Sequence, residues 1–262
     1  VRDAAAEAGV DVMQTEWSML GDAPDVSTGF PASYEAATKM DIALFMAKII
    51  YTDLAVGNMT AWSYWTAMAQ EKWSQKNRFY LIRLNANGDS GVESYGDIKK
   101  GGKVAADKNL WTLGNYSRFI RPGYKRVAVE GADDLNGLMC SAYISPDGKQ
   151  TVCVFVNMSK EKRTVNLSLR NTETGSFKKY VTNITTNLKL DETDSQLSSI
   201  SLTSRSVTTL VIDNAGDTAV GEIKADTRKG SDKVYDLRGI AARNTPQGVY
   251  IYKGKATVFG EK

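Results

Sequence analysis

Histidine is absent from all 262 residues of the sequence. Without an imidazole, the chain cannot form Ser-His or Cys-His nucleophilic systems, and it cannot hold a metal through histidine ligands. Carboxylates, amines and phenols are the groups that remain for acid and base chemistry. Any hydrolytic reaction of this chain is therefore expected to use carboxylates.

Long apolar runs and a concentration of one charge are also lacking. The longest apolar stretch, 41–56, is interrupted by Lys48 and Asp53 and is too short to cross a bilayer. The chain has 33 Lys and Arg against 30 Asp and Glu, and the basic residues are scattered. The sequence thus predicts neither a membrane span nor a nucleic-acid-binding surface. A hydrophobic content of 42% with 24% charged residues indicates a globular chain.

Cysteine is scarce, with Cys140 and Cys153 on either side of a Ser-Pro-Asp-Gly-Lys turn signal that begins at Ser145. A three-residue hairpin loop would pair Ser145 with Lys149 and place Cys140 opposite Val154. One apolar face would then contain six residues, Leu138, Cys140, Ala142, Val152, Val154 and Val156. Cys153 would point to the other face, so we expect two free thiols. A two-residue turn would oppose the cysteines and reverse this expectation.

The N-terminal part has the pattern of a parallel βαβ unit. Residues 1–9 are expected to form the end of a helix that Gly9 stops. An apolar run, 10–18, precedes a predicted helix over 34–56 with Ser33 as its N-cap. A second short apolar run, 59–65, is rich in aromatic residues. Strand, helix and strand in this order predict two parallel strands.

Alternation along the two predicted strands determines which side chains share a face. The first strand would present Val10, Val12, Gln14 and Glu16 on one face, and the second would present Met59, Ala61, Ser63 and Trp65. We therefore expect Glu16 and Trp65 to stand side by side at one end of the sheet. Trp62 and Tyr64 are expected to pack between strand and helix.

The rest of the chain changes from helical to alternating periodicity. An excursion made of segments 78–84 and 103–105, separated by a turn-rich stretch, precedes a helix over 108–120 that is stopped by Pro122. Six strand candidates follow, at 125–130, 138–144, 151–157, 163–169, 178–182 and 206–212. Their spacing is typical of an antiparallel β-sandwich.

The expected fold class is therefore α/β followed by all-β. The expected domains are an α/β part at 1–123, a β-sandwich at 124–213, a polar linker at 214–232 and a small β module at 233–262. Thirty residues cannot bury much of a core by themselves, so this last module is expected to be loosely held or docked.

Three features together resemble the C-terminal part of glycoside hydrolase family 30, in which a (β/α)8 barrel is fused to a β-sandwich. They are the strand ending in Glu16 and Trp17, the strand ending in Trp65, and the Ser-Arg-Phe-Ile-Arg-Pro-Gly helix end at 117–123 that leads into the sandwich. The resemblance covers about residues 1–213. It implies that the two strands are the seventh and eighth of the barrel.

The resemblance implies that Glu16 is the catalytic nucleophile of a retaining glycosidase and that Trp65 lines the sugar site. Retaining enzymes hold two carboxyl groups about 5–5.5 Å apart, one as nucleophile and one as acid/base. The family's acid/base is a Glu in an Asn-Glu motif on the fourth strand, and no Glu in this sequence follows an Asn. We therefore expect a C-terminal part of a glycosidase that is inactive alone. No metal or organic cofactor is implied.

Two further tryptophans, Trp17 and Trp73, are expected on the loops after these strands. They are candidates either for additional sugar subsites or for packing. The Trp-Ser-Tyr-Trp-Thr run that contains Trp65 most resembles the endo-β-1,6-galactanase branch of the family, which also includes enzymes acting on β-1,6-glucan, glucuronoxylan and glucosylceramide. For Glu16 itself, the alternative is an ordinary solvated carboxylate at a strand end.

The C-terminal segments 235–239 and 248–252 are similar to sorting domains of the type IX secretion pathway of gram-negative bacteria. This implies a secreted or cell-surface protein whose last module is recognised by secretion machinery. An ordinary β-hairpin appendage is the alternative. A second functional class also stays open, namely a non-catalytic β-sandwich that binds carbohydrate or anchors a surface complex.

Overall fold

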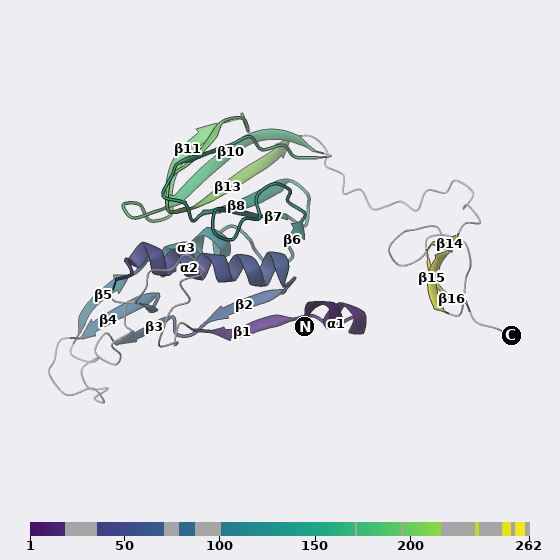
Figure 1. Cartoon of the computed structure of the whole chain (residues 1–262), viewed down its shortest axis with the longest axis horizontal. Coiled ribbons are helices and arrows are strands. Elements are labelled where there is room, and N and C mark those ends of the chain that lie inside the picture. Colours follow the sequence, from purple (N-terminus) through teal and green to yellow (C-terminus); the bar gives the residue numbers. More distant parts are fainter. Residues whose placement is uncertain are drawn as a thin grey trace. The chain divides into compact units, whose positions relative to one another are not determined.

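The computed structural model describes residues 1–18, 36–70, 79–86, 101–170, 172–194, 196–215, 234–235, 248–252 and 255–259. The chain divides into two compact units, Val1–Asp217 and Thr218–Lys262 (Figure 1). Within the described residues, no helix has the length and hydropathy needed to cross a membrane.

The first unit begins with the predicted βαβ arrangement. Strand β1 (Met13–Trp17) pairs in parallel with β2 (Ala61–Tyr64). Between them lies helix α2 (Lys39–Tyr51), which continues into a π-helical turn, η2 (Thr52–Val56). The short helix α1 (Arg2–Ala8) precedes β1 and is ended by Gly9 at φ 65°, as expected. The parallel unit is confirmed.

Helix α2 begins later than predicted. A capping box surrounds Thr38, whose side chain accepts from the Asp41 N–H (3.1 Å) while the Asp41 carboxylate accepts from the Thr38 N–H (2.8 Å). This reciprocal pair satisfies two helix-end donors and starts the helix at Lys39. The predicted start at Tyr34 was therefore wrong, and Ser33 lies outside the described residues.

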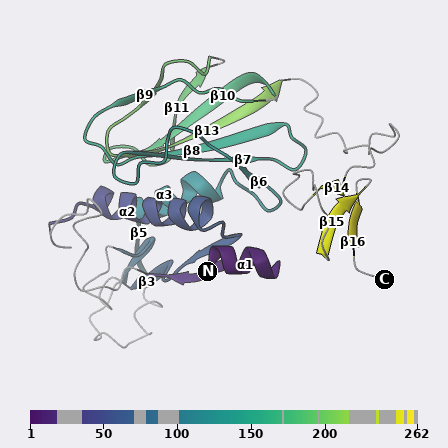
Figure 2. The ribbon, with the colours of Figure 1, turned by 45° about the vertical axis from the view of Figure 1, so that its right-hand side comes forward.

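Helix α2 is the centre of the unit. Its buried residues occupy all sides of the helix and include Met40, Ile42, Leu44 and Ile50. Figures 1 and 2 show α2 and α3 (Lys108–Ser117) as a layer between the β1–β2 pair and the β-sandwich. A helix that is apolar all round is stable only when it is covered on both sides.

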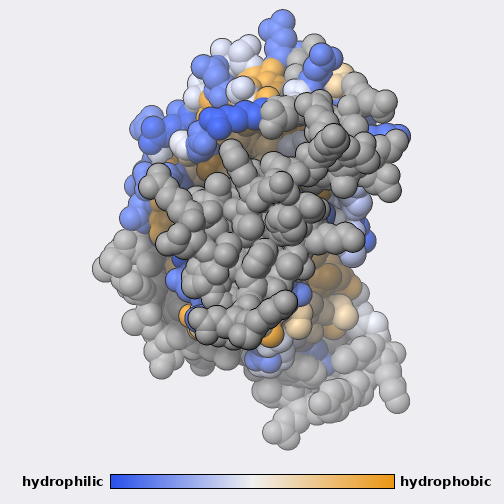
Figure 3. Space-filling view, turned by 90° about the vertical axis from the view of Figure 1, so that its right-hand side faces the viewer, coloured by the Kyte–Doolittle hydropathy of each residue, from blue (hydrophilic) through white to orange (hydrophobic). Residues whose placement is uncertain are grey.

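The predicted β-sandwich is confirmed. Its large sheet has the strand order β11-β10-β13-β8-β7-β6, and β12 and β9 form a two-stranded sheet. The bounds are β6 Lys125–Val127, β7 Leu138–Ile144, β8 Gln150–Asn157, β9 Arg163–Val165, β10 Glu173–Thr182, β11 Lys189–Asp194, β12 Ile200–Leu202 and β13 Ser206–Ala215. β11 and β12 were not predicted, because β11 is a polar edge strand and β12 has three residues. Where described residues are visible in the upper part of Figure 3, hydrophilic side chains stand beside smaller hydrophobic areas.

The central strands of the large sheet, β7, β8 and β13, are buried on both faces. One face carries Cys140, Cys153 and Phe155, which pack in the core of the sandwich with Phe177. The opposite face joins α2 in the other core, through residues that alternate with the first set and include Met139, Val152, Val154 and Val156. One sheet therefore links the helical layer to the sandwich.

This double burial explains an error in the predicted hairpin register. The Ser145 N–H donates to the Gln150 carbonyl (2.9 Å), and the Ser145 hydroxyl accepts from the Gln150 N–H (2.9 Å), so the loop has four residues instead of three. Cys140 consequently lies opposite Phe155, not Val154, and Cys153 shares the face of Cys140. Both thiols are free, as predicted, although the predicted faces were wrong. An apolar face cannot specify register where both faces are apolar.

A third, smaller sheet follows β2. It consists of β3 (Met68–Gln70), parallel to β4 (Ile82–Ala86), and β5 (Gly102–Ala106), antiparallel to β4. β4 and β5 thus overlap the two segments of the predicted excursion, and β3 was not predicted. Helix α3 ends at Ser117 instead of Ile120, and Arg121 Nη1 donates to the Ser117 carbonyl at its end (2.7 Å).

The end of α3 is fastened to the large sheet by a buried polar network. Asn115 Nδ2 donates to Thr182 Oγ1 (2.7 Å) and to the Trp111 carbonyl (2.9 Å), and Thr209 Oγ1 donates to Asn115 Oδ1 (3.0 Å). All three residues of the Asn115, Thr182 and Thr209 network are fully buried. The Arg118 guanidinium lies 5.6 Å from the Tyr180 ring centroid. The end of α3 is therefore joined to the large sheet through Asn115 and through Arg118, the second residue of the helix-end motif.

The second unit contains a three-stranded antiparallel sheet. Its strands are β14 (Val234–Tyr235), β15 (Gly248–Tyr252) and β16 (Lys255–Phe259). All three strands lie within the predicted β module at 233–262. In the first unit, β13 runs to Ala215, beyond the predicted sandwich end at 213; the rest of the predicted linker lies outside the described residues.

We expect the substitution Asn115→Ala to lower the free energy of unfolding by about 2–4 kcal/mol, because it leaves a cavity and removes buried hydrogen-bond partners. Urea denaturation measures this change. Arg170→Ala is the control, since Arg170 forms an exposed ion pair with Glu130 and should leave the urea midpoint nearly unchanged. Equal midpoints for the two variants would contradict the structural role of Asn115.

Candidate functional site

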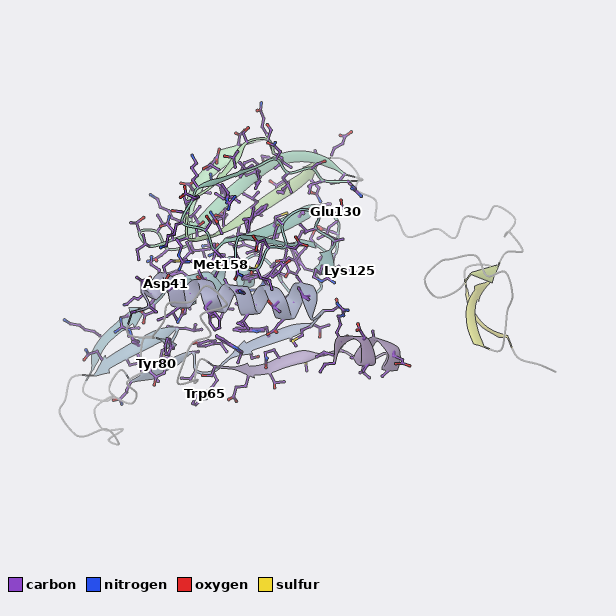
Figure 4. The ribbon with its side chains drawn as sticks, viewed as in Figure 1. Asp41, Trp65, Tyr80, Lys125, Glu130 and Met158 are labelled. Atoms are coloured by element: carbon purple, nitrogen blue, oxygen red, sulfur yellow. The ribbon has the colours of Figure 1, made fainter. Side chains whose placement is uncertain are left out.

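Glu16 and Trp65 both lie at the carboxyl end of the β1–β2 pair. The Trp65 N–H donates to the carbonyl of Trp17, the residue after Glu16 (3.0 Å). Both side chains are exposed, Trp65 by 49%. The Trp17 and Tyr64 rings lie on the α2 side of the strands, so alternation places Glu16 and Trp65 on the opposite face. Figure 4 shows Trp65 on the side of the strands that faces away from α2.

A β-bulge produces this arrangement. Met13 and Gln14 pair with Ala61 and Trp62, but the next pair is Trp17 with Tyr64, so β1 has one more residue than β2 in this interval. Gln14 therefore points to the α2 side, where its side chain hydrogen-bonds Asp53. The prediction that Gln14 and Glu16 share a face was wrong, because simple alternation ignores the extra residue.

The site is backed by a cluster of aromatic rings. The Trp17 ring lies 5.9 Å from Trp62, 5.8 Å from Tyr64 and 6.3 Å from Phe45 of α2, measured between centroids. Trp62 and Tyr64 pack against the helix, as predicted. Trp17 is the last residue of β1, not a loop residue, and its half-buried ring belongs to this packing. Trp73 lies outside the described residues.

Asp53 supports the cluster from η2, and no sequence pattern indicated this role. Its carboxylate accepts from Trp62 Nε1 (2.9 Å) and hydrogen-bonds the Gln14 side chain. Burial raises the pKa of the Asp53 carboxyl, although the hydrogen bonds from Trp62 and Gln14 act in the opposite direction. Asp53 thus forms hydrogen bonds to both β1 and β2, on the face of the strands opposite Glu16.

The chain beyond Trp65 is held by bonds on both sides of this residue. The Tyr64 hydroxyl donates to the Phe79 carbonyl, and the Ile82 N–H donates to the Ala67 carbonyl (2.8 Å). Asn109 Nδ2, at the start of α3, also donates to the Phe79 carbonyl (3.1 Å). The segment 79–82 is therefore bonded to the chain on both sides of Trp65.

A buried carboxylate lies just behind this segment. Asp107 accepts from Arg83 Nε (2.5 Å) on β4 and from Lys39 Nζ (2.7 Å), at the first residue of α2. The Asp107 side chain is 1% exposed, so its charge is compensated by these cations in place of water. No sequence pattern indicated this cluster.

A cavity in the described part of the chain lies elsewhere. It has about 700 Å³ and is lined by Met59 and Thr60, which precede β2, by the start of β2, and by the end of α3 and the following turn. None of the candidate site residues lines it. In the described part of the chain, no group of three or more Cys, Asp and Glu could hold a metal ion.

Comparison with known proteins identifies the family. The model of O-glycosyl hydrolase family 30 matches residues 1–77, and that of the glycosyl hydrolase family 30 β-sandwich domain matches residues 123–210. The chain belongs to glycoside hydrolase family 30. The first family 30 segment contains Glu16 and Trp65, and the second contains the sandwich.

Solved structures agree with this family 30 fold. A conserved exported protein from Bacteroides fragilis is 30% identical, with a TM-score of 0.64, over 79% of this chain and 40% of that one. The family 30 subfamily 8 xylanase Xyn30A from Clostridium acetobutylicum is 21% identical, with a TM-score of 0.56, over 80% and 44%. A family 30 endoxylanase from Clostridium papyrosolvens is 24% identical, with a TM-score of 0.55, over 81% and 44%. The chain spans less than half the length of these structures.

We expect Asp53→Asn to change how stability depends on pH. A raised folded pKa means that the stability contributed by neutral Asp53 is present below its unfolded pKa and is lost as the pH rises through the folded pKa. Asn keeps an acceptor for Trp62 Nε1 without the charge. The variant should therefore gain stability relative to the wild type as the pH rises from about 4 to 7, measured by urea unfolding.

Asp147→Asn is the matched control with the opposite sign. Hydrogen bonds from the Ser145 hydroxyl and the Lys149 N–H hold the pKa of Asp147 below its usual range. Its contribution to stability is present above the unfolded pKa and is lost as the pH falls through the folded pKa. Parallel pH profiles for both variants would refute the role given to Asp53.

Proposed function

We propose that this chain is the Glu16-bearing part of a retaining glycoside hydrolase that cleaves β-linked polysaccharide. The observation that carries the proposal is the joint exposure of Glu16 and Trp65 on one face, at the carboxyl end of two parallel strands. In barrel enzymes, catalytic groups stand at this end of the strands. Membership of family 30 supports the assignment of Glu16 as nucleophile.

The chemistry would proceed by double displacement. The Glu16 carboxylate attacks the anomeric carbon and forms a glycosyl ester, while a second carboxylic acid protonates the leaving oxygen. Water then cleaves the ester, with the second group acting as base. The family resemblance places that group in an Asn-Glu dipeptide, which the 262 residues do not contain. We therefore infer that hydrolysis of natural glycans requires a carboxyl group from beyond these residues.

The aromatic face of Trp65 suits a sugar ring, whose axial C–H groups stack on indole. Its Trp-Ser-Tyr-Trp-Thr context supports a β-1,6-galactan substrate. The two named xylanases are less than 25% identical to this chain, so xylan is the comparison substrate and not the proposed one.

We also propose that the protein acts outside the cytoplasm. The exported protein from Bacteroides fragilis, with 30% identity, supports export. The similarity of 235–239 and 248–252 to type IX sorting domains supports recognition of the last module by secretion machinery of a gram-negative bacterium.

The nucleophile can be tested without the second carboxyl group. A 2-deoxy-2-fluoro-β-galactoside with a dinitrophenolate leaving group needs no acid assistance, and its fluorine slows breakdown of the glycosyl ester. We expect one glycosyl unit on the peptide that contains Glu16, detected by mass spectrometry. Glu16→Gln should reduce the labelling rate by at least about 10³-fold.

Glu7→Gln is the matched control, because Glu7 lies exposed on α1 and should not affect labelling. The corresponding β-xyloside should label more slowly if galactan is the substrate. Labelling of a different carboxylate, or equal labelling of the wild type and Glu16→Gln, would remove Glu16 from the mechanism.

A further inference from the structure

The Asp107 carboxylate connects the chain segments that follow both site strands. Lys39 is the first residue of α2, the next described element after β1 and Glu16. Arg83 belongs to β4, which is bonded to the chain directly after Trp65. The buried Asp107 carboxylate therefore binds one residue from the chain that follows β1 and one from the chain that follows β2.

Asp107 stands at the N-cap position of α3, yet its side chain does not cap that helix. Ser, Thr, Asp and Asn at this position usually accept from the first free N–H groups. Here the two oxygens serve two cations instead, Lys39 Nζ at 2.7 Å and Arg83 Nε at 2.5 Å. The Asp107 carboxylate therefore connects α2 and β4 instead of capping α3.

The link reaches Trp65 through backbone bonds. The Asp107 N–H donates to the Leu81 carbonyl (3.0 Å), and the neighbouring Ile82 N–H donates to the Ala67 carbonyl (2.8 Å). Side-chain and backbone groups of Asp107 thus act on adjacent residues of one segment. That segment is in turn bonded to both sides of Trp65.

We propose that Asp107 is a positioning residue for the glycan-binding face, which it serves by fixing the segment 79–83 beside Trp65 through Arg83 and Lys39. The proposal rests on the proposed function for its ligand, a β-linked glycan. Its structural part, that Asp107 determines the setting of Trp65, is tested separately.

The test uses the 262-residue chain labelled with 5-fluorotryptophan, and Trp65→Phe identifies the fluorine signal of Trp65. In Asp107→Asn, this signal should shift or broaden. Amide exchange at Ile82 should accelerate by at least about tenfold, the equivalent of one lost charge-assisted hydrogen bond. Exchange at Val154, in the centre of the large sheet, should not change.

Two variants serve as comparisons. Glu130→Gln removes the same charge from an exposed ion pair in the sandwich and should change neither signal. Arg83→Lys keeps the charge but loses the planar fork, so it should give an intermediate effect. If Asp107→Asn fails to fold, the Trp65 fluorine signal and the Ile82 amide exchange of Arg83→Lys decide on the positioning role.

Binding of a β-1,6-galacto-oligosaccharide provides the functional readout. Asp107→Asn should weaken it about 2–10-fold, the cost of ordering one or two loosened side chains. Unchanged Trp65 and Ile82 signals in the folded variant would overturn the positioning role. Absence of binding by the wild-type chain would count against the proposed function, while the fluorine and exchange results would still decide on Asp107.

Discussion

The burial of α2 on both sides is the constraint on which the rest of the first unit depends. Met46 and Ala47 at the centre of the helix are completely buried, and the aromatic cluster and the large sheet lie on opposite sides of it. Its N-terminus is fixed to the sandwich, where Arg205 bonds both Asp41 and the Met158 carbonyl (3.0 Å). Because the helix holds β1 and β2 through Trp17, Trp62 and Tyr64, the strand ends that carry Glu16 and Trp65 take their positions from it.

The opposite faces of the β1–β2 pair have different chemistry, and the bulge in β1 separates them. On the face toward α2, Asp53 hydrogen-bonds Gln14 and Trp62 beside the aromatic cluster. On the opposite face, Glu16 is exposed to solvent. Without the extra residue, strict alternation would place Glu16 on the same face as Gln14, pointing toward α2. The local irregularity is therefore what makes a carboxylate available at this strand end.

The elements with a strong period were predictable from the sequence, whereas features set by single side chains were not. The parallel strands, α3, β7 and β8 follow from apolar periodicity and turn residues. The helix start at Lys39 depends on one capping box, and the hairpin register depends on the Ser145 hydroxyl. Of the candidate site, Glu16 and Trp65 were found through family resemblance, and the packing of Trp62 and Tyr64 through alternation. The Asp107 cluster joins residues that are far apart in sequence. Local sequence patterns therefore could not predict it.

The two-sided burial of the large sheet bears on how such a protein can exchange parts during evolution. A recombination break between α3 and β6 would look harmless in the sequence, because Pro122 and Gly123 mark a turn there. It would nevertheless strip Met139, Val152, Val154 and Val156 of the helical layer that covers them. A sandwich inherited alone would need new polar residues along alternate positions of β7 and β8. We therefore expect α2, α3 and the sandwich to be inherited together as one unit.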